Sequence, residues 1–130
     1  MTVLRDEKIY TSTEITSISG GIVLTVNSTI SSVASTAVPL GIAGTYTSAS
    51  FDIRDYRYIV GTCLADQNGT LYVQYSWDDI NFDGESTEIY TANDKLCFKV
   101  PCLSYYAKIS YINGGVGQGT FRLHWGLATV

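Results

Sequence analysis

Charged side chains are scarce in this sequence. Lysine, arginine, aspartate and glutamate make up 15% of the 130 residues, whereas about 25% is usual for globular domains. The twelve acidic residues outnumber the eight basic ones, which gives a formal charge of −4. A nucleic-acid-binding protein would present a basic face, so no nucleic-acid partner is expected. A weakly charged exterior suggests instead that much of the surface contacts other proteins.

Residues that commonly carry catalysis are also few. The sequence has a single histidine, His124, and a catalytic nucleophile needs a base beside it. There is no GxSxG motif, and the glycine-rich run at 114–119 lacks the lysine of a phosphate-binding loop. His124 is expected on the outward face of a late strand. The sequence therefore predicts no enzyme, no catalytic residue and no cofactor.

The sequence lacks both a disulfide framework and a membrane span. Its three cysteines, Cys63, Cys97 and Cys102, form an odd set without CxxC spacing. Cys63 and Cys97 lie in apolar stretches and are expected as small buried side chains, with a Cys97–Cys102 disulfide as the less favoured alternative. No apolar run approaches the ~18 residues of a transmembrane helix. The first ten residues lack the apolar core of a secretory signal, so cytoplasmic synthesis is expected.

What the sequence has in abundance favours β-structure. Ten tyrosines accompany many threonine, valine and isoleucine residues, which suit pleated surfaces. Short alternating segments recur about every ten residues between turn signals, a pattern typical of sandwiches and barrels. Phe121, Leu123 and Trp125 are expected to share one buried face. Strands are predicted at 46–53, 58–65, 70–77, 88–91, 96–100, 106–112 and 120–125.

Two regions of the chain differ in amino-acid composition. Residues 1–40 are rich in serine and threonine and have no aromatic residue after Tyr10. Within them, residues 31–41 are interpreted as an extended linker that Pro39 and Gly41 close. The aromatic residues and the expected core lie in residues 41–130. The predicted organisation is an extended Ser/Thr-rich N-terminal arm over residues 1–40, followed by one β-sandwich domain over residues 41–130.

One turn partly matches a calcium-binding loop. Asp79, Asn81 and Asp83 place oxygen ligands at alternate positions before a glycine, as in the first half of such a loop. The second half fails, because the twelfth position is Tyr90 where a bidentate glutamate is needed. We favour a polar hairpin loop, with no metal expected and calcium as the weaker alternative.

Aromatic residues allow a second site hypothesis. Six of them could form a platform on which sugar rings stack, or could fill the core and cross-strand pairs of a tyrosine-rich sandwich. The second interpretation is favoured. The six residues are Tyr72, Tyr75, Trp77, Tyr105, Tyr106 and Tyr111.

Three longer phrases carry a family resemblance. They are GTYTSASFD at 44–52, ADQNGTLYVQYSWDDINFD at 65–83 and PCLSYYAKISYINGGVGQGTFRL at 101–123. Over residues 41–125 the chain resembles small virion proteins of tailed bacteriophages. The resemblance implies an all-β fold, an antiparallel β-sandwich that is jelly-roll-like, on the virion surface. It carries no catalytic residues.

The resemblance also implies a function. Such proteins decorate or cement the capsid, so the expected role is to bind the major capsid protein outside a phage head, as a homotrimer, after synthesis in the host cytoplasm. Low charge with abundant tyrosine, threonine and serine suits protein interfaces, and an extended arm can add a strand to a neighbour's sheet. The alternative is a carbohydrate- or receptor-binding module of a phage tail or fibre.

Overall fold

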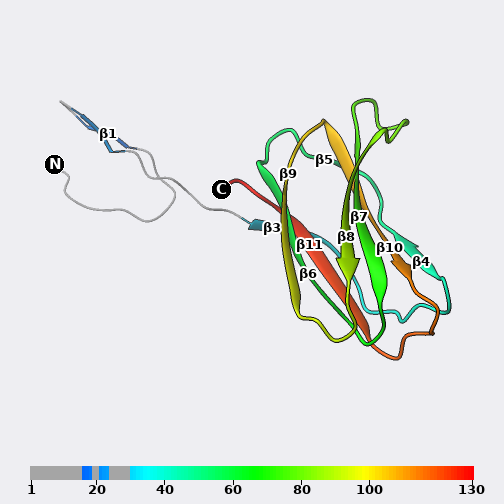
Figure 1. Cartoon of the computed structure of the whole chain (residues 1–130). Coiled ribbons are helices and arrows are strands. Elements are labelled where there is room, and N and C mark those ends of the chain that lie inside the picture. The colour runs from blue at the N-terminus through cyan, green and yellow to red at the C-terminus, as the bar shows by residue number, and fades with distance from the viewer. Residues whose placement is uncertain (1–15, 19–20, 24–29) are drawn as a thin grey trace.

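The computed structural model describes residues 16–18, 21–23 and 30–130. Throughout these residues the regular elements are β-strands (Figure 1), and no helix capable of crossing a membrane occurs among them. Two short strands, β1 (Thr16–Ile18) and β2 (Gly21–Val23), pair with each other in antiparallel fashion. The remaining strands, β3 to β11, build the body of the protein.

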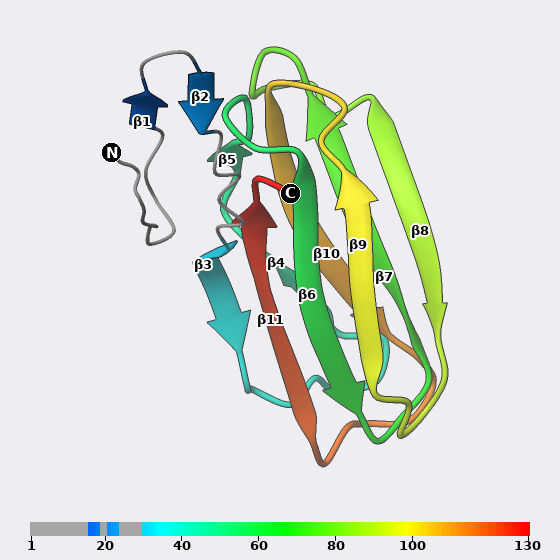
Figure 2. The same cartoon turned by 90° about the vertical axis from the view of Figure 1, so that its left-hand side faces the viewer.

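Strands β3 to β11 form two antiparallel sheets that pack face to face (Figures 1 and 2). One sheet has the order β4-β10-β7-β8, with β5 also paired to β10, and the other has the order β3-β11-β6-β9. The bounds are β3 (Ile30–Thr36), β4 (Thr45–Thr47), β5 (Phe51–Asp52), β6 (Tyr58–Ala65), β7 (Gly69–Ser76), β8 (Gly84–Tyr90), β9 (Leu96–Pro101), β10 (Tyr106–Asn113) and β11 (Phe121–Ala128). This order is that of a jelly roll, so the predicted fold class is confirmed.

Strand β3 corrects the predicted linker. Residues 31–41 were expected outside the sandwich, but β3 is an edge strand of the four-stranded sheet and pairs with β11, with Ala34 opposite Trp125. Val33 and Ala34 pack against the core. Because this strand contains only one large apolar side chain besides Ile30, its sequence gives a weak strand signal. The sandwich therefore begins at Ile30, and residues 1–15, 19–20 and 24–29 of the predicted arm lie outside the described residues.

Two further strands differ from their predicted ranges. The strand expected at 46–53 is divided into β4 and β5. At the break, the Ser48 side chain, and not a backbone carbonyl, accepts the hydrogen bond from the Ile109 N–H at 2.9 Å. Strand β8 starts at Gly84 rather than at residue 88. Its polar first half pairs with β7 from Gly84 opposite Tyr75 onward, although its composition resembles a loop.

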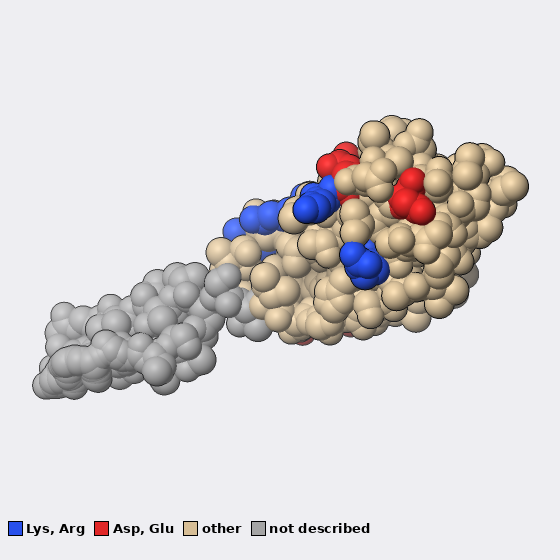
Figure 3. Space-filling model, turned by 90° about the horizontal axis from the view of Figure 1, so that it is seen from below, with Lys and Arg blue, Asp and Glu red and all other residues tan. Residues whose placement is uncertain are grey.

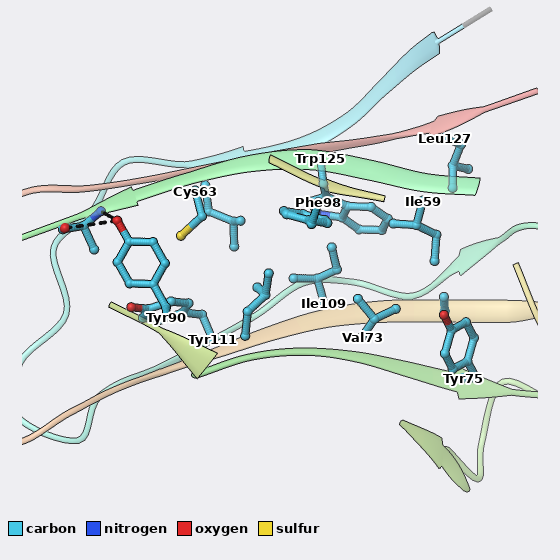
Figure 4. Close-up of a cluster of buried hydrophobic side chains, with 14 of the residues drawn as sticks. Ile59, Cys63, Val73, Tyr75, Tyr90, Phe98, Ile109, Tyr111, Trp125 and Leu127 are labelled. Atoms are coloured by element: carbon cyan, nitrogen blue, oxygen red, sulfur yellow. Dashed lines mark hydrogen bonds between the residues drawn. The ribbon is translucent and has the colours of Figure 1, made fainter. Parts of the chain in front are cut away.

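The core lies between the sheets and follows the predicted alternation. Along β11, Phe121, Leu123 and Trp125 are buried while Arg122 and His124 are exposed, as expected. Burying a side chain of this size contributes roughly 1.5–3 kcal/mol, so this inward face is a main source of stability. Figure 4 shows part of the core, including Ile59, Cys63, Val73, Tyr75, Tyr90, Phe98, Ile109, Tyr111, Trp125 and Leu127.

A buried tyrosine closes one end of the core. The register between β6 and β9 ends at Cys63 opposite Leu96, so the Ala65 N–H has no strand partner on that side. The Tyr90 hydroxyl accepts this N–H at 2.8 Å (Figure 4). The same hydroxyl lies within hydrogen-bonding distance of the carbonyl oxygen of Asp94. Burial raises the pKa of Tyr90, which keeps the hydroxyl in its proton-donating form.

Candidate functional site

Three chain connections meet at one end of the sandwich, the upper end in Figure 1. They are the segments between β5 and β6, between β7 and β8, and between β9 and β10. Trp77 follows β7 directly and Tyr105 precedes β10, and their rings pack edge to face with centroids 5.0 Å apart. Trp77 is 64% exposed and Tyr105 is 44% exposed. We call Asp52, Arg54, Trp77, Tyr105 and Tyr106 the loop-end cluster.

An ion pair lies beside these rings. Arg54 donates from Nε to both carboxylate oxygens of Asp52, at 3.0 and 3.2 Å, and from a terminal nitrogen to the second oxygen. These bonds lower the pKa of Asp52 to about 2 and raise the pKa of Arg54. The guanidinium carbon also lies 4.9 Å from the ring centroid of Tyr105 and 5.5 Å from that of Tyr106. The cluster therefore joins aromatic rings to a compensated charge pair.

The loop that carries Trp77 is held by Asp78. One carboxylate oxygen of Asp78 accepts the backbone N–H groups of Ile80 and Asn81, at 2.9 and 2.8 Å. The buried Ser76 hydroxyl donates to that oxygen and accepts the backbone N–H of Asp79 at 2.9 Å. Hydrogen bonds from Asn81 and Ile80 lower the pKa of Asp78 well below its usual range. This network fixes the backbone on both sides of Trp77.

The predicted calcium residues lie in this same loop. Asn81 uses its side-chain amide to donate to Asp78 at 2.8 Å, and Asp79 adopts a left-handed backbone with φ of 64°, which aspartate tolerates in turns. Asp78, which the sequence analysis did not single out, therefore organises the loop instead of Asp79, Asn81 and Asp83. Among the described residues, no group of three or more His, Cys, Asp or Glu side chains is placed to hold a metal ion. The polar hairpin loop stays the favoured interpretation, and calcium binding stays the untested alternative.

A hollow of about 250 Å³ adjoins the loop-end cluster. It lies where the three connections converge, and both apolar and polar side chains line it. The lining residues are Ile53, Arg54, Tyr56, Trp77, Cys102, Leu103, Ser104 and Tyr105. A hollow with this mixed lining can receive a small ligand that has both an apolar face and hydroxyl groups.

The six aromatic residues of the sugar-platform hypothesis do not lie together. Tyr75 and Tyr111 are buried in the core, as the favoured interpretation expected, and Tyr72 is half-buried on the outer face of its sheet opposite Ser110. Trp77, Tyr105 and Tyr106 come together at the loop end. The favoured interpretation is thus confirmed for Tyr75 and Tyr111, whereas sugar stacking on the exposed rings stays a prediction.

Sequence reasoning missed Asp52 and Arg54. Their spacing of two residues allows a local ion pair, but nothing in the sequence places them beside Tyr105, which lies about fifty residues later. The jelly-roll topology does so, because β5 pairs with β10 and Asp52 stands opposite Tyr106. The only available signal was a charged pair at the end of an apolar segment.

The outer face of the β3-β11-β6-β9 sheet forms a second surface. A hollow of about 370 Å³ lies on it, lined by Ile30, Ser32, Val60, Gly61, Thr62, Cys97, Phe98, His124 and Gly126. His124 is exposed, as predicted, and its Nε2 lies 3.0 Å from the Ser32 hydroxyl. The partner of the histidine thus comes from β3, the strand that the sequence analysis assigned to a linker. Apart from these polar groups, the lining of the hollow is largely apolar.

The cysteines divide between the core and this outer face. Cys63 is buried as predicted, but the prediction for Cys97 was wrong, because Cys97 points outward from β9 while its neighbour Phe98 points inward. Cys102 is half-buried, and all three thiols are free, so the alternative Cys97–Cys102 disulfide is absent. Burial raises the pKa of the Cys63 thiol to about 12.

Two solved structures resemble this fold. The crystal structure of the PBSX exported protein XepA has a TM-score of 0.68 at 19% sequence identity, over 85% of this chain and 42% of that chain. The chain thus spans less than half the length of that protein. The other, from work describing Bacillus endospore appendages as a family of disulfide-linked pili, has a TM-score of 0.55 at 10% identity, over 96% of this chain and 97% of that chain.

Sequence comparison gives the family. At the identities above, the structural likeness shows the fold alone, and no curated protein matches the chain in sequence. The family model described as "Uncharacterised protein YqxG N-terminal domain" matches residues 18–128. That range includes all strands of the sandwich. The chain therefore belongs to the YqxG N-terminal domain family.

Proposed function

We propose that this chain is a structural protein of a phage particle, of the capsid decoration or cement type, which acts through protein–protein contacts and not through catalysis. The observation that carries the proposal is a jelly-roll sandwich whose exterior has few charges and many exposed apolar side chains. Large apolar side chains are exposed at Ile30, Val38, Ile42, Trp77, Ile80, Ile89, Leu103 and Val116, among others. Such a surface is typical of proteins that are covered by partners.

The similar structures support the coarser part of this proposal. One is described as an exported protein and the other comes from pili, so the same fold serves in proteins that leave the cell or build extracellular fibres. The resemblance of residues 41–125 to small virion proteins supports the placement on a phage head. Charged side chains are also sparse on the face that Figure 3 shows.

Open sheet edges offer a means of contact. Among the strands that the structure describes, β8 pairs with β7 alone and β3 with β11 alone, so within these residues each has one unpaired row of backbone groups along its edge. Such edges accept strands from partners. Ile89 on β8 is 73% exposed and Ile30 on β3 is 67% exposed, which adds apolar area beside both edges.

The N-terminal arm supplies the proposed clamp. In this proposal, residues 1–29 add to an edge of the major capsid protein or of a sister subunit in a homotrimer. Main-chain hydrogen bonds would supply the affinity, and three subunits docked around one axis would bind more tightly together than singly.

Truncation of the arm tests the proposal. The deletion must remove residues 2–29 and stop before Ile30, because a longer deletion would remove β3 and open the sandwich beside β11. We expect the truncated protein to unfold at nearly the same temperature as the full chain but not to sediment with undecorated phage shells. The matched control is a full-length chain with residues 2–29 in shuffled order.

The possible results separate cleanly. Shell binding by the full chain that both variants lose, together with a trimer mass by light scattering, would support the clamp. Unchanged shell binding by the truncated protein would refute the role of the arm. A full chain that ignores phage shells would refute the decoration role itself.

A further inference from the structure

An exposed tryptophan held rigidly needs an explanation. Large aromatic side chains are the most costly apolar groups to leave in water, yet Trp77 is 64% exposed. Its backbone is fixed by the Ser76 and Asp78 hydrogen bonds described above, including that from the Asp79 N–H to the Ser76 hydroxyl at 2.9 Å. A ring that is rigid before binding loses little conformational entropy when a ligand covers it. The loop end thus presents a prepared apolar surface.

The polar part of the loop-end cluster is also prepared. Asp52 accepts the backbone N–H of Arg54 at 3.0 Å as well as its side-chain bonds, which locks the pair in one geometry. The bonds from Arg54 to Asp52 use Nε and Nη2, so Nη1 is the guanidinium nitrogen they leave for another acceptor. The backbone near Tyr105 is fixed as well, because the Ser104 hydroxyl donates to the carbonyl oxygen of Tyr106 at 2.8 Å.

Charge selects among ligand classes. Because Asp52 compensates Arg54, the site offers hydrogen-bond donors and acceptors without a net positive charge that would attract phosphate, sulfate or carboxylate. The ligand that matches is neutral, has an apolar face for an aromatic ring, and carries hydroxyl groups that both donate and accept. A pyranose ring has these properties, since its C–H bonds form an apolar face and its hydroxyls form a polar rim.

We propose that the loop-end cluster is a binding site for neutral saccharides, in which a pyranose ring packs against Trp77 and Tyr105 while its hydroxyls bond to Arg54 and Asp52. The hollow of about 250 Å³ beside these residues is smaller than the 300–1,000 Å³ typical of drug-sized ligands, so it suits one or two sugar rings. All five residues of the loop-end cluster lie between Asp52 and Tyr106, within the sandwich and outside residues 1–29, so the inference does not depend on the cement role.

Tryptophan fluorescence offers a direct test with the full chain. The protein has two tryptophans, and Trp125 is fully buried in the core, so a ligand-induced change in emission reports on Trp77. The probes are cellotetraose, maltotetraose and tetra-N-acetylchitotetraose as neutral saccharides, with a heparin tetrasaccharide as the anionic one. We expect saturable binding of at least one neutral probe, and no saturation with the anionic probe at equal concentration.

Three variants locate the site. Trp77→Ala, followed by calorimetry because it removes the fluorescent reporter, should weaken binding by about tenfold or more, as truncation of a central aromatic contact does. Arg54→Gln should weaken it, and this variant keeps Trp77 as the fluorescent reporter of binding. Ile89→Ala, at an exposed apolar residue on β8, is the matched control and should leave affinity unchanged.

Several outcomes would overturn the inference. They are saturation by none of the neutral probes up to about 10 mM, preference for the anionic tetrasaccharide, or equal loss of affinity in Ile89→Ala. Loss of shell sedimentation in Trp77→Ala without saccharide binding would assign the loop end to a protein contact instead. Since the arm truncation retains all five cluster residues, it should still bind saccharide, which separates this test from that of the proposed function.

Discussion

The hydroxyl of Tyr90 gives a stability prediction that follows from geometry alone. Tyr90→Phe removes one oxygen and leaves the ring in place, so no large cavity forms. The lost oxygen accepts the buried Ala65 N–H at 2.8 Å, and a buried donor left without a partner costs about 1–3 kcal/mol. The Tyr90 hydroxyl also lies within hydrogen-bonding distance of the carbonyl oxygens of Ala65 and Asp94, but these two groups lose little. The Ala65 carbonyl still accepts the Asn93 N–H at 2.7 Å, and Asp94 is exposed, so its carbonyl can bond to water.

We therefore expect Tyr90→Phe to lower the free energy of unfolding by about 2 kcal/mol. For a domain of this size, that loss lowers the melting temperature by roughly 6–10 °C. Urea denaturation followed by circular dichroism measures the change, and the m-value should stay constant because the exposed surface does not change.

A matched substitution controls for the chemistry of the change. Tyr111 is also fully buried, but its hydroxyl forms no well-aligned hydrogen bond in the described part of the chain, and its polar neighbour is the Gln118 side chain. Tyr111→Phe should therefore alter stability by no more than about 0.5 kcal/mol, or raise it, since it removes a buried polar atom. Equal losses in the two variants would refute the reasoning, because the cost would then not depend on the bond to Ala65.

Three further predictions concern other parts of the structure. Gly61→Ala should destabilise the protein by about 1–3 kcal/mol in urea denaturation, because a Cβ there would collide with the main chain of β11 and an aromatic ring of β9, whereas Gly115→Ala, in open space, should be neutral. The pKa of Asp52 is lowered from 3.8 to about 2, so the stabilisation by the ionised carboxylate is complete above the unfolded pKa and is lost as pH falls from about 4 to about 2. Asp52→Asn should therefore reduce the slope of melting temperature against pH in that window. An unchanged slope would contradict the ion pair. In native protein, a thiol reagent should modify Cys97 within minutes and Cys63 only on unfolding, as mass spectrometry of digests would show; equal rates would contradict the assigned burial.

Sequence patterns determined those features that depend on neighbouring residues. The alternation in β11 identified Phe121, Leu123 and Trp125 as buried, because successive side chains of a strand point to opposite faces. Turn residues located the hairpin ends for the same local reason. The all-β class and most strand positions followed from these patterns, as did the exposed position of His124.

Predictions from composition were wrong where contacts with residues distant in the chain, and not local residue properties, determine the structure. Strand β3 has the composition of a linker and is a strand only because the edge of β11 accepts its backbone. Cys97 lies in an apolar stretch, yet the pleat of β9 turns it outward. In both cases the decisive interaction is with residues far away in the chain.

The candidate site shows the same division most clearly. The sequence alone supplied Trp77, Tyr105 and Tyr106 as aromatic residues near predicted turns, but it grouped them with Tyr75 and Tyr111, which the core contains. Only the jelly-roll crossings, which bring three distant connections to one end, separate the exposed rings from the buried ones and add Arg54 with Asp52. Local periodicity fixes which way a side chain points, whereas the pairing of distant strands fixes what it meets.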